Sequence, residues 1–124
     1  MNTTLAAFLY TQGLIEDNES FFVNATTITD QLDECLSYLY TKLNEEVTES
    51  STEEEIQYWF YEAGKIHFAD NLRFWFQVLY SLILKEPSGS RFGFLTMTLG
   101  VDHILNLIYN VREGNILPNW GWIE

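Results

Sequence analysis

Apolar side chains recur at helical spacing through the first half of the chain, most clearly over residues 30–47. Residues three or four apart share one face of an α-helix, and the apolar positions here follow that rule. Thr29 or Asp30 is a suitable N-cap for this helix, because a short oxygen-bearing side chain accepts hydrogen bonds from the first free amides. The apolar stripe consists of Leu32, Cys35, Leu36, Leu39, Tyr40, Leu43 and Val47.

A second helix is predicted to begin at the acidic stretch in the middle of the chain. Thr52 and Glu55 have the spacing of a capping box, in which two side chains satisfy the free amides of the first helical turn. The acidic residues 53–55 then lie in that first turn, where the helix dipole favours negative charge. This helix either ends at Gly64 or continues to Lys85.

The second half of the chain also predicts helices. Residues 74–84 are apolar on nearly every side, which is typical of a helix covered by its own domain or by a second copy. The Glu-Pro-Ser-Gly-Ser sequence of residues 86–90 predicts a turn. Residues 101–112 carry an apolar stripe at helical spacing, and Gly114 is a suitable stop.

Residues 91–100 are ambiguous, because Leu95, Met97 and Leu99 alternate with threonines as in a strand. Gly93 and Gly100 lie seven residues apart, a spacing that suits one face of a closely packed helix. We therefore favour a helix over 91–100.

The N-terminal region predicts a short helix over residues 4–14, followed by a segment rich in β-branched residues. That segment, residues 21–29, is a candidate extended stretch. Taken together, the patterns predict an all-α fold in which residues 1–124 form a single domain, a compact bundle of about four to five helices.

Composition excludes several classes of protein. The 124 residues are 47% hydrophobic and 16% aromatic, which argues against intrinsic disorder. Six lysines and arginines are too few to build a basic face, so direct binding to nucleic acid or to an anionic membrane is not expected. No basic residue precedes the short apolar run of residues 5–10, and the longest apolar stretch is shorter than a membrane span. We therefore expect a cytoplasmic protein, and the single Cys35 excludes an intrachain disulfide framework.

The charge is strongly asymmetric along the chain. Residues 1–62 hold thirteen acids and one cation, Lys42, whereas residues 63–124 hold five of each. Such a one-sided excess is either a solvated face that keeps the protein soluble or a docking face for a basic partner. The candidate partner-binding acids are Asp30, Asp33, Glu34, Glu45, Glu46, Glu49, Glu53, Glu54 and Glu55.

Aromatic residues are concentrated between positions 58 and 80. Most are expected in the core, but consecutive aromatic residues cannot all face one core. Some are therefore candidates for an interface, where tyrosine and tryptophan often anchor a partner. The candidate interface aromatics are Tyr58, Trp59, Tyr61, Trp75, Trp120 and Trp122.

Catalytic and metal-binding patterns are weak. His67 and Asp70 share a helical face, but the Glu-x-x-His spacing of a di-metal bundle is absent. Asp102 and His103 are adjacent and point in different directions, and we expect His103 to be partly buried and hydrogen-bonded. Residues 88–91 precede a helix without a phosphate-binding fingerprint. We expect no catalytic residue, no metal and no cofactor.

The leading hypothesis is a non-enzymatic protein that docks its acidic half on a basic, nucleic-acid-binding surface of a target protein. It would act as a nucleic-acid mimic, an inhibitor or immunity protein of the kind that phages and mobile elements encode, and steering by charge would speed its association. The alternative is a structural module that self-associates or joins a larger complex through its aromatic C-terminal half. An enzyme that uses His67 or His103, or a small-ligand carrier, is a further possibility.

Overall fold

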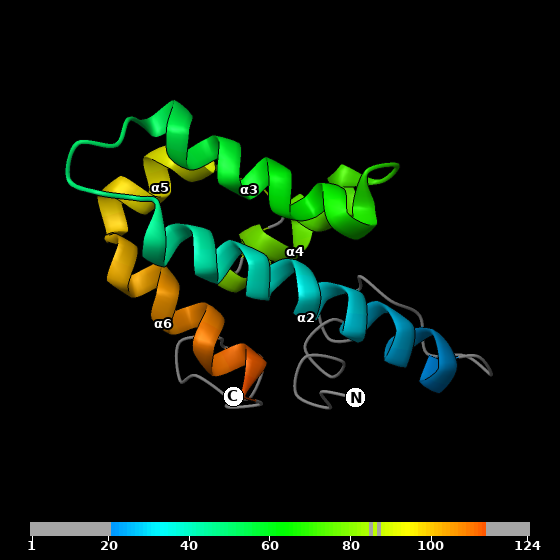
Figure 1. The fold of residues 1–124 in the computed structure, drawn as a ribbon. Coiled ribbons are helices and arrows are strands. Elements are labelled where there is room, and N and C mark those ends of the chain that lie inside the picture. Colours follow the sequence, from blue (N-terminus) through cyan, green and yellow to red (C-terminus); the bar gives the residue numbers. More distant parts are fainter. Residues whose placement is uncertain (1–20, 85, 87, 114–124) are drawn as a thin grey trace.

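The structure, a computed structural model, describes residues 21–84, 86 and 88–113. Its elements follow the chain as α2 (Phe21–Glu45), α3 (Glu53–Phe68), α4 (Leu72–Leu84), α5 (Phe92–Leu99) and α6 (Val101–Arg112). These described residues contain helices and no strand, so the prediction of an all-α fold is confirmed (Figure 1).

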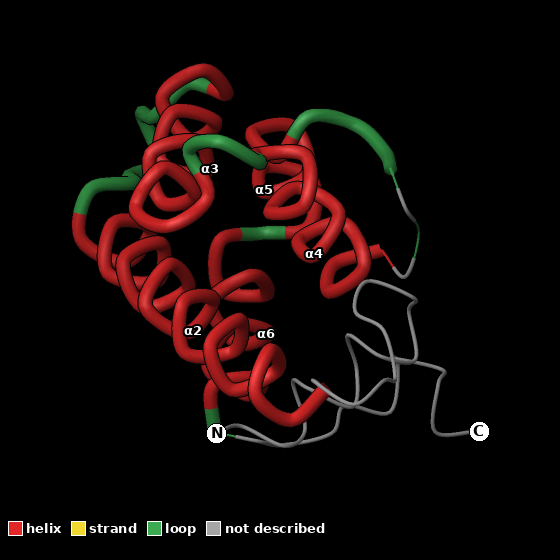
Figure 2. Tube along the Cα trace, turned by 90° about the vertical axis from the view of Figure 1, so that its right-hand side faces the viewer, coloured by secondary structure: helices red, strands yellow, loops and turns green. Residues whose placement is uncertain are grey.

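The long helix α2 is the centre of the arrangement. It lies between α3 and α6 and packs against both of them (Figure 1). The short helix α5 packs against α3 and leads directly into α6, while α4 contacts α3 and α6 (Figure 2). The connection between α2 and α3, residues 46–52, therefore lies at one end of the bundle, beside α5 and the start of α6.

The prediction of an extended segment at residues 21–29 is wrong, because α2 already begins at Phe21. Each β-branched residue in a helix costs less than about 1 kcal/mol relative to alanine. Once the strongly amphipathic part of α2 has formed, each added residue gains a backbone hydrogen bond without a new nucleation cost. The same extension removes the predicted N-cap: Thr29 and Asp30 lie inside the helix, and Thr29 is buried.

The core follows the predicted stripe of α2. Five of its members, Leu32, Cys35, Leu36, Leu39 and Leu43, are buried, and Tyr40 packs at the edge of the core. The helix ends at Glu45 and not at residue 47 as predicted, so Val47 packs against the core from the connection that follows α2. The buried residues of α2 belong to one apolar core together with buried side chains from every other described helix. Among the largest buried side chains are Phe60 from α3, Trp75 from α4 and Phe92 from α5.

Gly64 does not end α3; it makes room for a tryptophan. A Cβ atom at Gly64 would lie 2.2 Å from Cδ1 of Trp75. The Trp75 indole N–H donates a hydrogen bond of 2.9 Å to the Phe60 carbonyl oxygen, and the side chain is fully buried. Trp75 is therefore a core residue, which corrects its prediction as an interface aromatic. The helix ends at Phe68, and α4 begins at Leu72, so the predicted continuous run to Lys85 is broken.

The helix predicted over residues 91–100 is confirmed, but its two glycines have different roles. Gly93 is buried in α5, and a Cβ atom there would lie 2.1 Å from the carbonyl oxygen of Glu53 in α3. Gly100 ends α5 with a φ of +98°, a conformation that glycine adopts at no steric cost, and α6 follows at an angle of 103°. Gly93 thus serves close packing, whereas Gly100 forms the corner.

Several predictions lie outside the described residues. They are the helix over residues 4–14, the stop at Gly114, and the interface roles of Trp120 and Trp122. Within the described part of the chain, no single helix is both long and apolar enough to cross a membrane. The helices α5 and α6 meet that criterion only when they are taken together as a bent pair.

Candidate functional site

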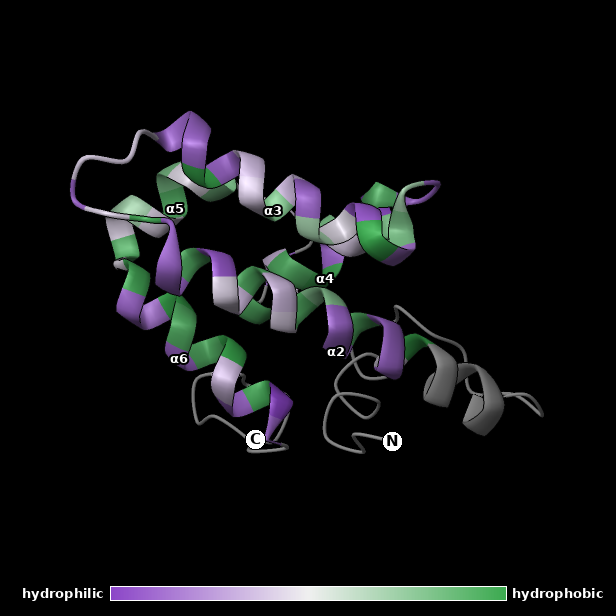
Figure 3. Ribbon diagram, in the orientation of Figure 1, coloured by the Kyte–Doolittle hydropathy of each residue, from purple (hydrophilic) through white to green (hydrophobic). Residues whose placement is uncertain are grey.

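Six exposed glutamates gather where α2 ends and α3 begins. We call this region the acidic end; its members are Glu45, Glu46, Glu49, Glu53, Glu54 and Glu55. Because α2 and α3 pack side by side and are joined by seven residues, the two helix ends lie together (Figure 1). Hydropathy colouring shows hydrophilic residues at the end of α2 and in the first turn of α3 (Figure 3). Within the described residues, none of the six forms an ion pair with a lysine or arginine.

Short polar side chains fix the backbone between the two helices. The Thr48 N–H donates to Ser51 Oγ at 2.9 Å, and the Ser50 N–H donates to Thr48 Oγ1 at 3.2 Å. Thr52 is the N-cap of α3, and its hydroxyl oxygen accepts a hydrogen bond of 3.1 Å from the Glu55 N–H. The Thr52 hydroxyl in turn donates to Glu55 Oε1 at 3.3 Å. The predicted N-cap is therefore present, but the Glu55 carboxylate accepts from the Thr52 hydroxyl and not from the Thr52 backbone N–H, so the reciprocal half of the predicted capping box is replaced by a side-chain hydrogen bond.

Helix electrostatics explains only half of the acidic end. Glu53, Glu54 and Glu55 occupy the first turn of α3, where the helix dipole stabilises an anion by about 0.3–1 kcal/mol. Glu45 and Glu46 lie at the C-terminal end of α2, where the same dipole opposes negative charge. Helix stability thus gives no reason for glutamates at these two positions, where lysine or arginine would be favoured.

The acids in the middle of α2 have a different role from those at its end. Arg112 Nε donates to Asp33 Oδ1 at 2.9 Å, which ties α6 to α2. His67 Nε2 is hydrogen-bonded to Glu34 Oε2, which ties α3 to α2. Asp30 is exposed, but it lies about 22 Å along the helix from Glu45. The nine candidate partner-binding acids are therefore divided, and six of them form the acidic end.

Lys42 is the one lysine or arginine of the first half of the chain, and aromatic rings hold it. Its ammonium group lies 5.1 Å from the ring centroid of Trp59 and 5.6 Å from that of Tyr38. A cation at this distance is attracted by the negative face of an aromatic ring. Lys42 therefore contacts ring faces at the α2–α3 interface and forms no ion pair with a described glutamate.

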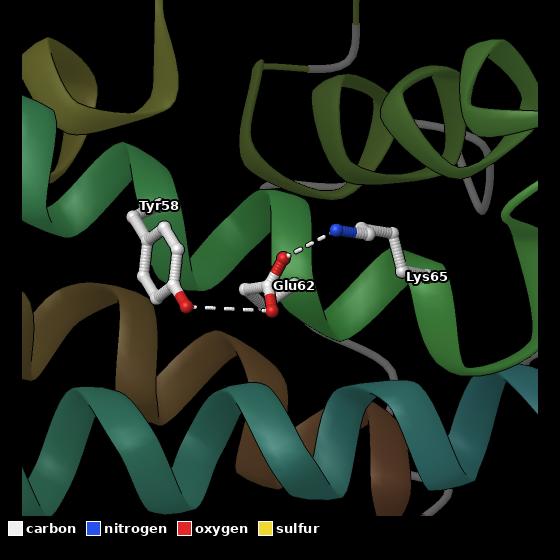
Figure 4. Close-up of polar contacts among 3 residues, drawn as sticks. All are labelled: Tyr58, Glu62 and Lys65. Atoms are coloured by element: carbon white, nitrogen blue, oxygen red, sulfur yellow. Dashed lines mark hydrogen bonds and ion pairs between the residues drawn. The ribbon is translucent and has the colours of Figure 1, made fainter.

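Beyond the acidic end, the next glutamate of α3 is Glu62, and its charge is neutralised by Lys65 (Figure 4). Lys65 Nζ lies 2.8 Å from Glu62 Oε2, and the Tyr58 hydroxyl donates to Glu62 Oε1 at 3.4 Å. The hydrogen bond with Glu62 and the Glu62 charge raise the pKa of Lys65 above its usual value. The Lys65 ammonium also lies 5.2 Å from the Tyr61 ring. Of the predicted interface aromatics, Tyr58 and Tyr61 are exposed and Trp59 is half-buried.

Two hollows flank the acidic turn. One has a volume of about 400 Å³ and is lined by Glu46 from the end of α2 and by Glu54, Glu55, Tyr58 and Trp59 from α3. The other, of about 340 Å³, lies between the end of α2 and the start of α6. Its lining is half aliphatic and half polar or acidic, and consists of Leu43, Asn44, Val47, Thr48, Glu49, Val101, Asp102 and Leu105.

The histidines and the cysteine do not form a common centre. His67 contacts Glu34, and Asp70, which was expected on the same helical face, lies beyond the end of α3. His103 is exposed, which corrects the expectation that it is partly buried. Cys35 is buried in the core, and this burial raises the pKa of its thiol to about 11. In the described ranges, no three histidine, cysteine or carboxylate side chains are close enough together to hold a metal ion.

The aromatic hollow was not predicted from the sequence, although the spacing of four of its residues indicates it. Glu54 and Tyr58 are four residues apart, as are Glu55 and Trp59, so each pair shares a face of α3. The contribution of Glu46 depends on the turn between α2 and α3 and has no signal in the spacing. No protein-family model matches the chain, and no solved structure matches it significantly.

Proposed function

We propose that this protein is a non-enzymatic binding protein that docks its acidic end on a basic surface of another protein. The observation that carries the proposal is the group of six exposed glutamates, which no lysine or arginine of the described chain neutralises by an ion pair. Glu45 and Glu46 strengthen it, because they sit against the dipole of α2. Concentrated negative charge costs stability through self-repulsion, and binding to a basic partner repays that cost.

The most suitable target is a protein that itself binds nucleic acid. The groove of such a protein is basic, because it must neutralise phosphate groups. A rigid acidic turn can occupy the groove in place of nucleic acid, so the proposed action is inhibition by competition. Charge steering makes association fast and sensitive to salt, since screening acts over about 8 Å at physiological ionic strength. We place this activity in the cytoplasm and assign it to an inhibitor or immunity-type protein of a phage or mobile element.

The test compares two variants with the same loss of charge. The first, Glu45→Gln/Glu49→Gln/Glu53→Gln, removes three charges at the acidic end and leaves the aromatic hollow unchanged. The second, Asp70→Asn/Glu86→Gln/Glu113→Gln, removes three exposed charges elsewhere. The wild-type protein and the second variant should capture the same basic protein from native lysate, and added nucleic acid should displace that protein. Equal capture by both variants, or capture that nucleic acid does not reduce, would contradict the proposal.

A second candidate function, self-association, is favoured by one observation. The outer side of α5 exposes Phe94, Met97 and Leu99, three large apolar side chains in eight residues. In contrast, α4 buries Trp75, Val78, Leu79 and Leu82 in the core of the same chain. Sedimentation of the wild-type protein and of Phe94→Ser/Met97→Ser tests the idea. A multimer that dissociates in the variant would support it, and a wild-type monomer at all concentrations would rule it out.

A further inference from the structure

The aromatic hollow at the acidic end suggests which part of a basic partner is recognised. We propose that this hollow receives the guanidinium group of an arginine side chain that the partner presents. The inference rests on the proposed function and goes further, because it names one anchor group and distinguishes it from general attraction between opposite charges.

The lining of the hollow combines two kinds of attraction for an organic cation. Tyr58 and Trp59 supply aromatic surface, with ring centroids 5.0 Å apart and the planes at 73° to one another. Glu46, Glu54 and Glu55 supply three carboxylates from two different helix ends. A hydrated metal ion would bind the carboxylates and gain little from the aromatic rings. A guanidinium or ammonium group is attracted by both the rings and the carboxylates.

The chain itself shows that this aromatic surface attracts a cation. The ammonium group of Lys42 lies over the Trp59 ring, although Glu45 and Glu46 lie close by in sequence and form no ion pair with any described residue. This contact is independent of the acidic cluster, because it concerns the ring face and not the carboxylates. Lys42 is not among the described residues that line the hollow. Because Lys42 already lies over the Trp59 ring, an incoming cation would rely mainly on the Tyr58 ring and the three carboxylates.

Arginine fits this lining better than lysine does. Its guanidinium group is planar, so it can lie flat on a tyrosine or tryptophan ring while its N–H groups bind a carboxylate in a fork. It is also more weakly hydrated than an ammonium group, which lowers the cost of entering the hollow. A volume of about 400 Å³ accommodates the guanidinium group together with the aliphatic part of the side chain and some flanking backbone.

The experiment uses two blocked peptides of equal charge, hexa-arginine and hexa-lysine, titrated into the full chain by calorimetry. Stacking and forked hydrogen bonds should make the arginine peptide bind about five- to thirtyfold more tightly. In a ¹⁵N-correlation spectrum, the arginine peptide should shift the indole N–H signal of Trp59, which a Trp59→Phe variant assigns.

Three single variants locate the preference. Tyr58→Leu removes the ring and should reduce the preference for arginine to less than about twofold. Tyr58→Phe removes only the hydroxyl that bonds Glu62 and should keep the preference. Tyr109→Leu is the matched control, because Tyr109 on α6 is 52% exposed and Tyr58 is 53% exposed. It should behave as the wild-type protein does.

Failure of this inference is distinguishable from failure of the proposed function. Equal affinity for the two peptides, no binding of either, or a preference that survives Tyr58→Leu would overturn the arginine hollow. The acidic-end docking would still stand if the two matched charge-loss variants differed in capture of a basic partner. If those variants did not differ while the preference for arginine held, the hollow would be a cation site and the broader docking proposal would fall.

Discussion

Replacement of Gly93 by alanine is a sharp test of the packing that holds the acidic end in place. The added Cβ atom would lie 2.1 Å from the carbonyl oxygen of Glu53 and 2.8 Å from its carbonyl carbon. Both are backbone atoms, so no side chain can rotate away to relieve the overlap. Contacts of a real Cβ atom are essentially never closer than 3.0 Å, so α5 and α3 must separate by about 1 Å.

The expected loss of stability follows from three opposing effects. Alanine gains about 1 kcal/mol over glycine in helix propensity. Overpacking of a close contact costs about 1–3 kcal/mol. The separation also lengthens the 3.0 Å hydrogen bond from the Gly93 N–H to Gln57 Oε1, worth about 0.5–1.5 kcal/mol, and disturbs the stack of Phe60 on Phe92. We expect a net loss of about 1–3 kcal/mol.

Urea unfolding followed by far-ultraviolet circular dichroism measures this loss. A matched control is Thr98→Ala on the exposed side of the same helix, which gains helix propensity without a steric conflict. It should leave stability unchanged or raise it by about 0.5 kcal/mol. The reasoning is refuted if Gly93→Ala is as stable as Thr98→Ala, because the close approach of α5 to α3 would then not exist in solution.

Three further predictions concern other contacts of the core and surface. Trp75→Phe should lower the free energy of unfolding by about 2–4 kcal/mol, because it leaves a cavity and removes the hydrogen bond to the Phe60 carbonyl; chemical denaturation checks this. Arg112→Gln should cost less than about 1 kcal/mol in the same assay, because the side chains of Arg112 and Asp33 are 35% and 41% exposed and water screens their pair. Burial raises the pKa of Cys35 from 9.0 to about 11, so the folded state favours the neutral thiol. The neutral Cys35 thiol therefore makes its full contribution to the free energy of unfolding below pH 9, and this contribution is lost as the pH rises to about 11. Urea unfolding of the wild-type protein across that interval should show a decline that Cys35→Ala lacks, and equal declines would contradict the assignment.

The helices could be predicted from the sequence because their apolar periodicity and caps are local properties. The stripe of α2 and the cap at Thr52 depend only on spacing along the chain, and both are present. The start of α2 was missed, because continuation of a formed helix outweighed the preference of β-branched residues for strands. Burial of Trp75 was missed as well, because the space for its ring is provided by Gly64, eleven residues earlier on another helix.

The candidate site was only partly predictable for a similar reason. The acids that face solvent could be predicted from their positions opposite the apolar stripe. The side chains with which they pair could not be predicted. Asp33 and Glu34 are engaged by Arg112 and His67, which come from distant parts of the chain. The separation of the acidic end from these paired acids is therefore a result of tertiary packing.

The most direct test of acidic-end docking is the dependence of partner affinity on salt. The dissociation constant of the captured basic protein should be measured over a range of salt concentrations with the wild-type chain and the two matched charge-loss variants. Each of the three replaced glutamates is expected to form one exposed ion pair with the partner, worth about 0.2–1 kcal/mol. Loss of all three predicts that Glu45→Gln/Glu49→Gln/Glu53→Gln binds roughly 3- to 150-fold more weakly at low salt, with a shallower salt dependence. The variant Asp70→Asn/Glu86→Gln/Glu113→Gln should follow the wild-type curve. Identical curves for the two variants, or an affinity that salt does not change, would contradict docking through the acidic end.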